Sequence, residues 1–210
     1  MADDAISVLQ TVANHPRLNG EKIGLMGFSK GGTASLRLSL AFFNKPGKKQ
    51  FASFIAMYPS CTDYRLDPKT TGKPILMILG EKDTWTNPET CADIARIQKE
   101  RGANISAPII PGAEHGWDVP GSSHVETPRA ENYSKCVFVE IKPSIWIESR
   151  SKIVVYNERG LQKEERERAL KSCMTYGVSS GYSVKAAEQS WELIKGHLTK
   201  DLSGRLQAPP

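Results

Sequence analysis

A strand, a sharp turn and a helix follow one another near the start of the chain, and this segment constrains its fold most. The mostly apolar residues 23–27 predict a strand, and the helical spacing of apolar residues over 33–43 predicts a helix. The turn between them has the pattern Gly-x-Ser-x-Gly centred on Ser29, which in this context is typical of a nucleophile elbow. Such a turn holds its serine in a strained conformation above the sheet, at a helix N-terminus that favours negative charge. We expect Gly27 and Gly31 here because the strand and helix backbones pass too close for a Cβ atom.

An elbow serine needs a base and an orienting acid beside it, and two later loops offer them. Asp83 lies in a loop after the apolar run 73–80, and His115 lies in a loop after the shorter run 105–110. In an open parallel sheet the loops that follow the strands share one edge, so Ser29, Asp83 and His115 are predicted to meet there. Their order along the chain is the order found in α/β hydrolases.

Each of these residues also has a purely structural interpretation. Ser29 would be the N-cap of a glycine-rich turn, Asp83 a helix-capping acid, and His115 a loop histidine bonded to backbone. Asp118 and Glu81 are the other acids near enough in sequence to orient the base. We prefer Asp83 because it stands three residues past the end of its predicted strand.

Three segments resemble the catalytic segments of the dienelactone hydrolase family: Gly27-Phe28-Ser29-Lys30-Gly31-Gly32, Leu79-Gly80-Glu81-Lys82-Asp83 and Ala113-Glu114-His115-Gly116-Trp117-Asp118. The resemblance covers residues 5–118 and the final helix at 184–199. It implies an α/β-hydrolase fold with a mostly parallel sheet, and hydrolase activity. The best-known members carry cysteine where this chain has Ser29, which moves the expected chemistry from lactones towards general esters.

The predicted elbow strand comes only about twenty residues into the chain, whereas several strands precede it in a complete α/β hydrolase. We therefore expect an N-terminally truncated sheet whose apolar elbow-strand edge pairs with another copy, giving a homo-oligomer. The Lys30 N–H is expected to serve as one oxyanion donor, while the usual second donor from an upstream loop is missing. Losing one donor costs about 100- to 1,000-fold in rate. The alternative to an enzyme is thus a catalytically impaired fragment that acts only as a binding or assembly module.

The rest of the sequence predicts one α/β domain over residues 1–200 and a frayed tail at 201–210. Residues 119–182 are expected to form an antiparallel insertion before the last helix, serving either as a flap beside the site or as surface cover. In chain order we predict helices at 2–14, 88–102, 161–176 and 184–199, a strand at 51–58, short strands within 135–157, and loops at 62–73 and 119–135.

The composition narrows the range of partners. The 210 residues carry a net charge of +5, but the basic residues form no dense patch with interleaved aromatic residues, so nucleic acid is not expected. No apolar stretch is long enough to span a membrane. Residues 1–20 lack the pattern of a signal peptide, and the compartment stays open.

The four cysteines show no spacing typical of a zinc site. Cys61 and Cys91 each lie near the catalytic edge, so a disulfide between them is geometrically reasonable, and Cys136 would then pair with Cys173 across the insertion. Four free buried thiols are the alternative. The lack of a signal peptide pattern favours that alternative, and the even count favours pairing.

Three aromatic residues flank the catalytic loops, namely Tyr58, Trp85 and Trp117. They are expected either to form an apolar substrate wall or to pack in the core. Together the segments predict a serine hydrolase that cleaves carboxylic esters of small or aryl acids through an acyl-enzyme. Lactones and polyesters are open alternatives, and no metal or organic cofactor is expected.

Overall fold

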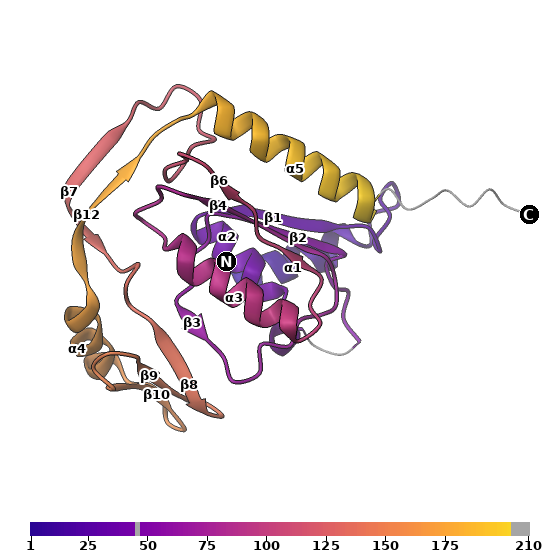
Figure 1. The fold of residues 1–210 in the computed structure, drawn as a ribbon. Coiled ribbons are helices and arrows are strands. Elements are labelled where there is room, and N and C mark those ends of the chain that lie inside the picture. The colour runs from indigo at the N-terminus through magenta and orange to yellow at the C-terminus, as the bar shows by residue number, and fades with distance from the viewer. Residues whose placement is uncertain (45–46, 203–210) are drawn as a thin grey trace, which may run out of the picture.

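A parallel five-stranded sheet forms the centre of the computed structural model, which describes residues 1–44 and 47–202 (Figure 1). Its strand order is β1-β2-β4-β5, with the short β6 also paired to β4. Every pairing in it is parallel. The strands are β1 (Gly24–Phe28), β2 (Ser53–Met57), β4 (Ile75–Gly80), β5 (Ile105–Ser106) and β6 (Ile109–Ile110). The predicted α/β fold with a mostly parallel sheet is therefore confirmed.

Helices cover both faces of this sheet because its central strands are apolar on both sides. Helices α1 (Ala2–Val12), α2 (Lys30–Leu38) and α3 (Pro88–Glu100) pack on one face, against side chains such as Phe54 and Met77. The long helix α5 (Val184–Leu202) packs on the other face. Figure 1 shows α5 on the side of the sheet opposite to α3. Strand β1 pairs only with β2 in the described chain, so it is an edge strand.

The insertion before α5 has its own sheet and its own small core. The sheet runs in the order β11-β10-β9-β8-β3 and is antiparallel except where β3 meets β8. Its elements are β3 (Asp63–Tyr64), β8 (Phe138–Lys142), β9 (Ile145–Glu148), β10 (Val154–Asn157), β11 (Gly160–Leu161) and α4 (Lys163–Cys173). A disulfide between Cys136 and Cys173 lies in its core, which also contains Phe138 and Val155.

A two-stranded antiparallel ribbon links this insertion to the central domain, and the sequence did not predict it. It consists of β7 (Val125–Asn132) and β12 (Thr175–Ser180), which lie side by side at one flank of the molecule (Figure 1). The predictions of a loop at 119–135 and of a helix reaching 176 are therefore wrong in part. Strand β7 is polar and mostly exposed, so it lacks the apolar alternation that would predict a strand. Its partner strand begins only at Thr175, far along the chain.

Three other predicted boundaries also differ. The elbow helix ends at Leu38 rather than Phe43, because the chain turns at Leu40 to pair with Thr70 before the short 3-10 helix η1 (Ala41–Phe43). The run 105–110 divides into two short strands around Ala107 and Pro108. The expected loop 62–73 contains β3, which extends the insertion sheet.

The last predicted feature, the tail, lies outside the described residues from position 203 onward. In the chain up to that point, apart from residues 45–46, no helix combines the length and the apolar character needed to cross a membrane.

Candidate active site

The turn around Ser29 has the geometry of a nucleophile elbow. Ser29 adopts φ 50° and ψ −116°, outside the regions that ordinary residues occupy, and its N–H donates to the Met57 oxygen at 3.0 Å. A Cβ on Gly27 would come within 2.2 Å of the Gly31 carbonyl, and one on Gly32 within 2.5 Å of the Met57 oxygen. A Cβ on Gly31 would meet nothing within 4 Å. The prediction that Gly31 avoids a steric clash is therefore wrong, and Gly32 is the second position that close packing reserves for glycine.

The structure brings Ser29, His115 and Asp83 together at the carboxyl edge of the sheet. His115 Nε2 lies 3.0 Å from Ser29 Oγ, and His115 Nδ1 lies 2.8 Å from Asp83 Oδ2. An ionised carboxylate can only accept hydrogen bonds, so this contact places the proton of the neutral imidazole on Nδ1. Nε2 is then free to accept the Ser29 hydroxyl proton. The three groups therefore form one continuous chain of hydrogen bonds.

Asp83 is held in place by its own loop. Its Oδ1 accepts the N–H groups of Trp85 and Thr86 at 2.8 and 2.9 Å, and Thr86 Oγ1 donates to Oδ2 at 2.9 Å. The Asp83 side chain is 1% exposed and that of His115 is 13% exposed, so water has little access to their contact. The two competing acids point elsewhere, since Glu81 accepts the Gly112 N–H and Asp118 accepts the Tyr58 hydroxyl.

The three flanking aromatic residues take different positions. Trp117 is fully buried and donates to Ser190 Oγ at 2.8 Å, so the substrate-wall prediction is wrong for Trp117, which packs in the core. Tyr58 is 3% exposed, and its ring packs edge-on to His115 at 4.7 Å. Burial and the nearby Asp118 carboxylate raise the pKa of the Tyr58 hydroxyl, which keeps it a donor. Trp85 is 41% exposed, with its ring 5.8 Å from that of His115.

The β7–β12 ribbon contacts the loops that carry Asp83 and His115, through residues that no sequence pattern indicates. Asn132 Nδ2 donates to the Thr84 oxygen at 2.8 Å, and the Ser179 N–H donates to Thr84 Oγ1 at 2.8 Å. On the other loop, the Gly181 N–H donates to the His115 oxygen at 3.2 Å. Asn132 is buried, which is unusual for an asparagine in a polar strand. The sequence gives no sign of this burial, because it results from contacts with distant segments.

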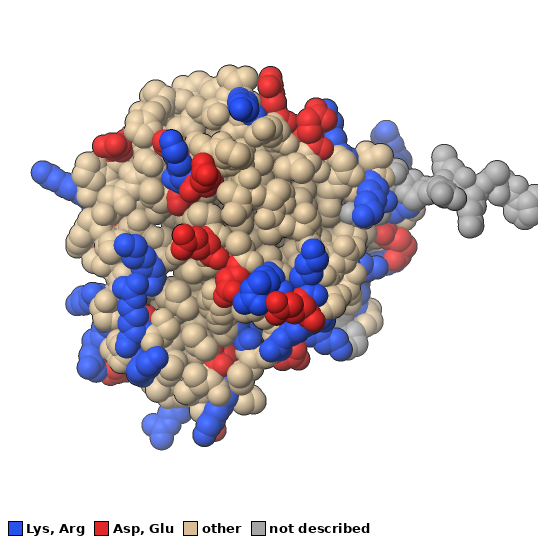
Figure 2. Space-filling view, in the orientation of Figure 1, with Lys and Arg blue, Asp and Glu red and all other residues tan. Residues whose placement is uncertain are grey.

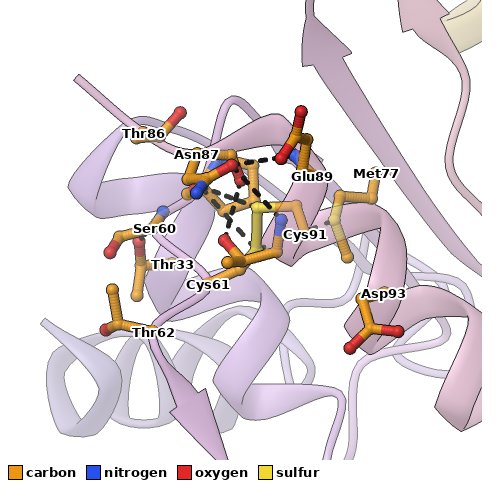
Figure 3. Close-up of a disulfide and its surroundings, with 12 residues drawn as sticks. Thr33, Ser60, Cys61, Thr62, Met77, Thr86, Asn87, Glu89, Cys91 and Asp93 are labelled. Atoms are coloured by element: carbon orange, nitrogen blue, oxygen red, sulfur yellow. Dashed lines mark hydrogen bonds between the residues drawn. A yellow bond between two sulfur atoms is a disulfide. The ribbon is translucent and has the colours of Figure 1, made fainter. Parts of the chain in front are cut away.

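A disulfide joins Cys61 to Cys91 (Figure 3). It ties the segment that follows β2 to the first turns of α3, the helix that follows the Asp83 loop. Asn87 caps that helix by accepting the N–H groups of Glu89 and Thr90. Both cysteines are buried, so the disulfide joins the segment after β2 to helix α3 within the core.

Two further features bear on the chemistry of the site. Lys30 is the first residue of α2, so its backbone N–H is one of the amides that have no partner within the helix. In residues 1–44 and 47–202, no His, Cys, Asp and Glu side chains gather in a group that could hold a metal ion.

Comparisons with solved structures give several similar proteins. An apo structure of esterase 2 from Thermogutta terrifontis is 20% identical, with a TM-score of 0.46 over 57% of this chain and 55% of that chain. The same esterase phosphorylated by paraoxon is 22% identical, with a TM-score of 0.47 over 57% and 55%. A candidate dienelactone hydrolase from Klebsiella pneumoniae is 13% identical, with a TM-score of 0.54 over 95% and 60%. The chain thus spans 55–60% of the length of these structures.

The Klebsiella likeness extends through the insertion and shows a shared fold. A comparison with curated proteins gives no match. The model of the dienelactone hydrolase family matches residues 1–140, which include the elbow, the Asp83 loop and the His115 loop. The chain therefore belongs to the dienelactone hydrolase family.

Proposed function

We propose that this protein is a serine hydrolase that cleaves carboxylic esters through an acyl-enzyme on Ser29. The observation that carries the proposal is the unbroken contact chain from Ser29 Oγ through His115 to Asp83, with distances of 3.0 and 2.8 Å. Membership of the dienelactone hydrolase family supports hydrolase chemistry. Small or aryl esters are the proposed substrates, and lactones or polyesters are further candidates.

The proposed reaction has two halves. Ser29 Oγ attacks the ester carbonyl while His115 Nε2 takes its proton, and the carbonyl oxygen becomes an oxyanion beside the Lys30 N–H. The C–O bond to the alcohol then breaks, and His115 returns the proton to the leaving oxygen. In the second half a water gives a proton to His115 and attacks the acyl carbon. The bond from that carbon to Ser29 Oγ then breaks, His115 returns the proton to Oγ, and the acid leaves. Asp83 stabilises the imidazolium in both halves.

Trp85 is the proposed apolar contact for the substrate, because its ring is exposed beside His115. Tyr58 is proposed instead as a positioning residue. Its ring supports the imidazole, and its hydroxyl bonds Asp118 at 2.6 Å, in the same loop as the histidine. Losing that bond would loosen the loop that carries the base.

The test is pre-steady-state hydrolysis of p-nitrophenyl acetate and butyrate. The wild type should release nitrophenol in a burst that matches the enzyme concentration, and Ser29→Ala should show none. Ser7→Ala is the matched control, because Ser7 lies on the exposed face of α1 and bonds only its own helix. Equal slow rates for wild type and Ser29→Ala would overturn the proposal and favour a binding or assembly module.

A further inference from the structure

A cavity of about 870 Å³ lies between the insertion and the central domain, at the start of α2. Lys30, which follows Ser29 in the chain, and Ser60, which follows β2 at the same sheet edge, line it. The opposite wall comes from the insertion, through Phe138, Trp146 and Tyr156. A molecule bound at Ser29 could therefore extend past Lys30 into this space.

The charged residues that line the cavity do not balance. It has four cationic residues, Lys30, Arg37, Arg65 and Arg166, and two acidic ones, Asp63 and Glu140. The carboxylate of Asp63 pairs with Arg37 at 2.6 Å. That of Glu140 accepts the backbone N–H groups of Leu66 and Ser144.

Two guanidinium groups are thus left facing aromatic rings instead of carboxylates. Arg65 Cζ lies 4.6 Å from the Phe42 ring, 5.2 Å from Phe43 and 5.0 Å from Trp146. Arg166 Cζ lies 6.0 Å from the Phe138 ring. Neither arginine forms an ion pair within residues 1–44 and 47–202. In Figure 2 basic side chains predominate on the visible face over the part that Figure 1 labels α4, β9 and β10.

We propose that this cavity binds a negatively charged aromatic group, the part of the ester substrate that lies away from the scissile bond. The aromatic walls offer stacking surfaces, and unpaired guanidinium groups bind carboxylates through paired N–H donors. This inference rests on the proposed function, because the bound group is part of a substrate only if the protein cleaves esters. Most of the aromatic wall belongs to the insertion, so the insertion acts as a specificity element.

The test measures binding to the Ser29→Ala variant by titration calorimetry, with 4-acetoxybenzoate as probe and the neutral 4-acetoxybenzamide as its near-isosteric control. The benzoate should bind roughly tenfold more tightly than the amide, and this preference should shrink as the salt concentration rises. Adding Arg166→Gln should remove most of the preference. Adding Arg168→Gln should not, because Arg168 lies on the same helix but pairs with Glu165 and does not line the cavity.

Equal affinities for acid and amide, no binding of either, or equal effects of the two arginine substitutions would each overturn the inference. Arg166 is exposed, so its loss leaves the fold intact. Because binding to Ser29→Ala needs no nucleophile, this result is separate from the burst experiment. A preference for the acid without a burst would support the cavity inference and contradict the proposed ester hydrolysis. A burst without that preference would support ester hydrolysis and contradict the cavity inference.

Discussion

Asn132 donates a 2.8 Å hydrogen bond to the backbone oxygen of Thr84, the residue that follows Asp83. Its Nδ2 also lies 3.1 Å from the Gly177 oxygen on the paired strand, so one amide joins the two strands of the ribbon to the acid loop. The ribbon also meets the loop that carries His115, where the N–H of Gly181, the residue directly after β12, donates to the His115 oxygen. The linker to the insertion is thus part of the support of the proposed catalytic loops.

Replacing Asn132 with alanine should slow the acylation step about tenfold, because the Thr84 oxygen loses its buried donor and the Asp83 loop gains freedom. The dissociation constant of the p-nitrophenyl acetate complex should change little, since Asn132 is buried and its amide bonds only backbone groups. The dependence of the burst rate on substrate concentration gives the acylation rate and this dissociation constant separately. Asn14→Ala is the control, because the Asn14 amide bonds only its own helix on the surface. A purely structural role would lower the melting temperature and leave the burst rate unchanged.

The two glycines after the elbow should respond differently to alanine. Gly32→Ala places a Cβ 2.5 Å from the Met57 oxygen and 3.1 Å from the Gly27 oxygen, where backbone must move. We expect it to lower the free energy of unfolding by about 2 kcal/mol or more. Gly31→Ala meets open space in a helix, and it should be neutral or stabilise by up to about 1 kcal/mol. Urea unfolding of both variants checks this, and equal effects would contradict the backbone geometry.

The features that the sequence predicted are those with a local physical signal. The apolar runs of β2 and β4, the Asn87 cap followed by proline, and the Gly-x-Ser-x-Gly turn each depend on residues close in the chain. Strand-end placement then brought Ser29, Asp83 and His115 to one edge, because parallel strands share it.

The features that the sequence missed depend on contacts between distant residues. The ribbon pairs Val125 with Ser180, and neither strand has the apolar alternation of a half-buried strand. Trp117 and Trp85 flank the same loops, yet α5 covers one and leaves the other exposed. The cavity is likewise lined by residues far apart in the chain, such as Arg65 and Trp146. No local pattern distinguishes these outcomes.

Glu148 should make the protein lose stability in acid. Burial alone would raise the pKa of its carboxyl group, but hydrogen bonds from the Ser151 and Arg150 N–H groups and from the Ser151 hydroxyl outweigh burial and hold the pKa below its usual range. A carboxyl group whose pKa is lowered by folding stabilises the protein at pH values above its pKa in the unfolded chain. That stabilisation is lost as the pH falls through its pKa in the folded protein.

Glu148→Gln should therefore cost about 2–3 kcal/mol of unfolding free energy at pH 7, because an amide turns a donor towards the loop N–H groups. The difference from wild type should shrink as the pH falls below the usual glutamate pKa of about 4.3 towards the lowered pKa of the folded state. Urea unfolding at pH 7 and pH 3.5 measures it. Glu167→Gln on the exposed face of α4 is the control and should change little at either pH. A constant difference across this range would show that the charge of Glu148 has no role.

The edge strand β1 should join a second copy of the chain. Its residues pair with β2 on one side only in the described structure, and the Ser29 N–H and Ile23 oxygen both point towards β2. By strand alternation, the Gly24, Met26 and Phe28 amides point away from β2 and are available to another strand. We expect light scattering to give a dimer at micromolar concentration. Gly24→Pro removes one outward N–H without touching the β1–β2 bonds, and it should shift the species towards monomer. A wild type that is monomeric at these concentrations would contradict pairing through this edge, and a variant that stays dimeric would place the contact elsewhere.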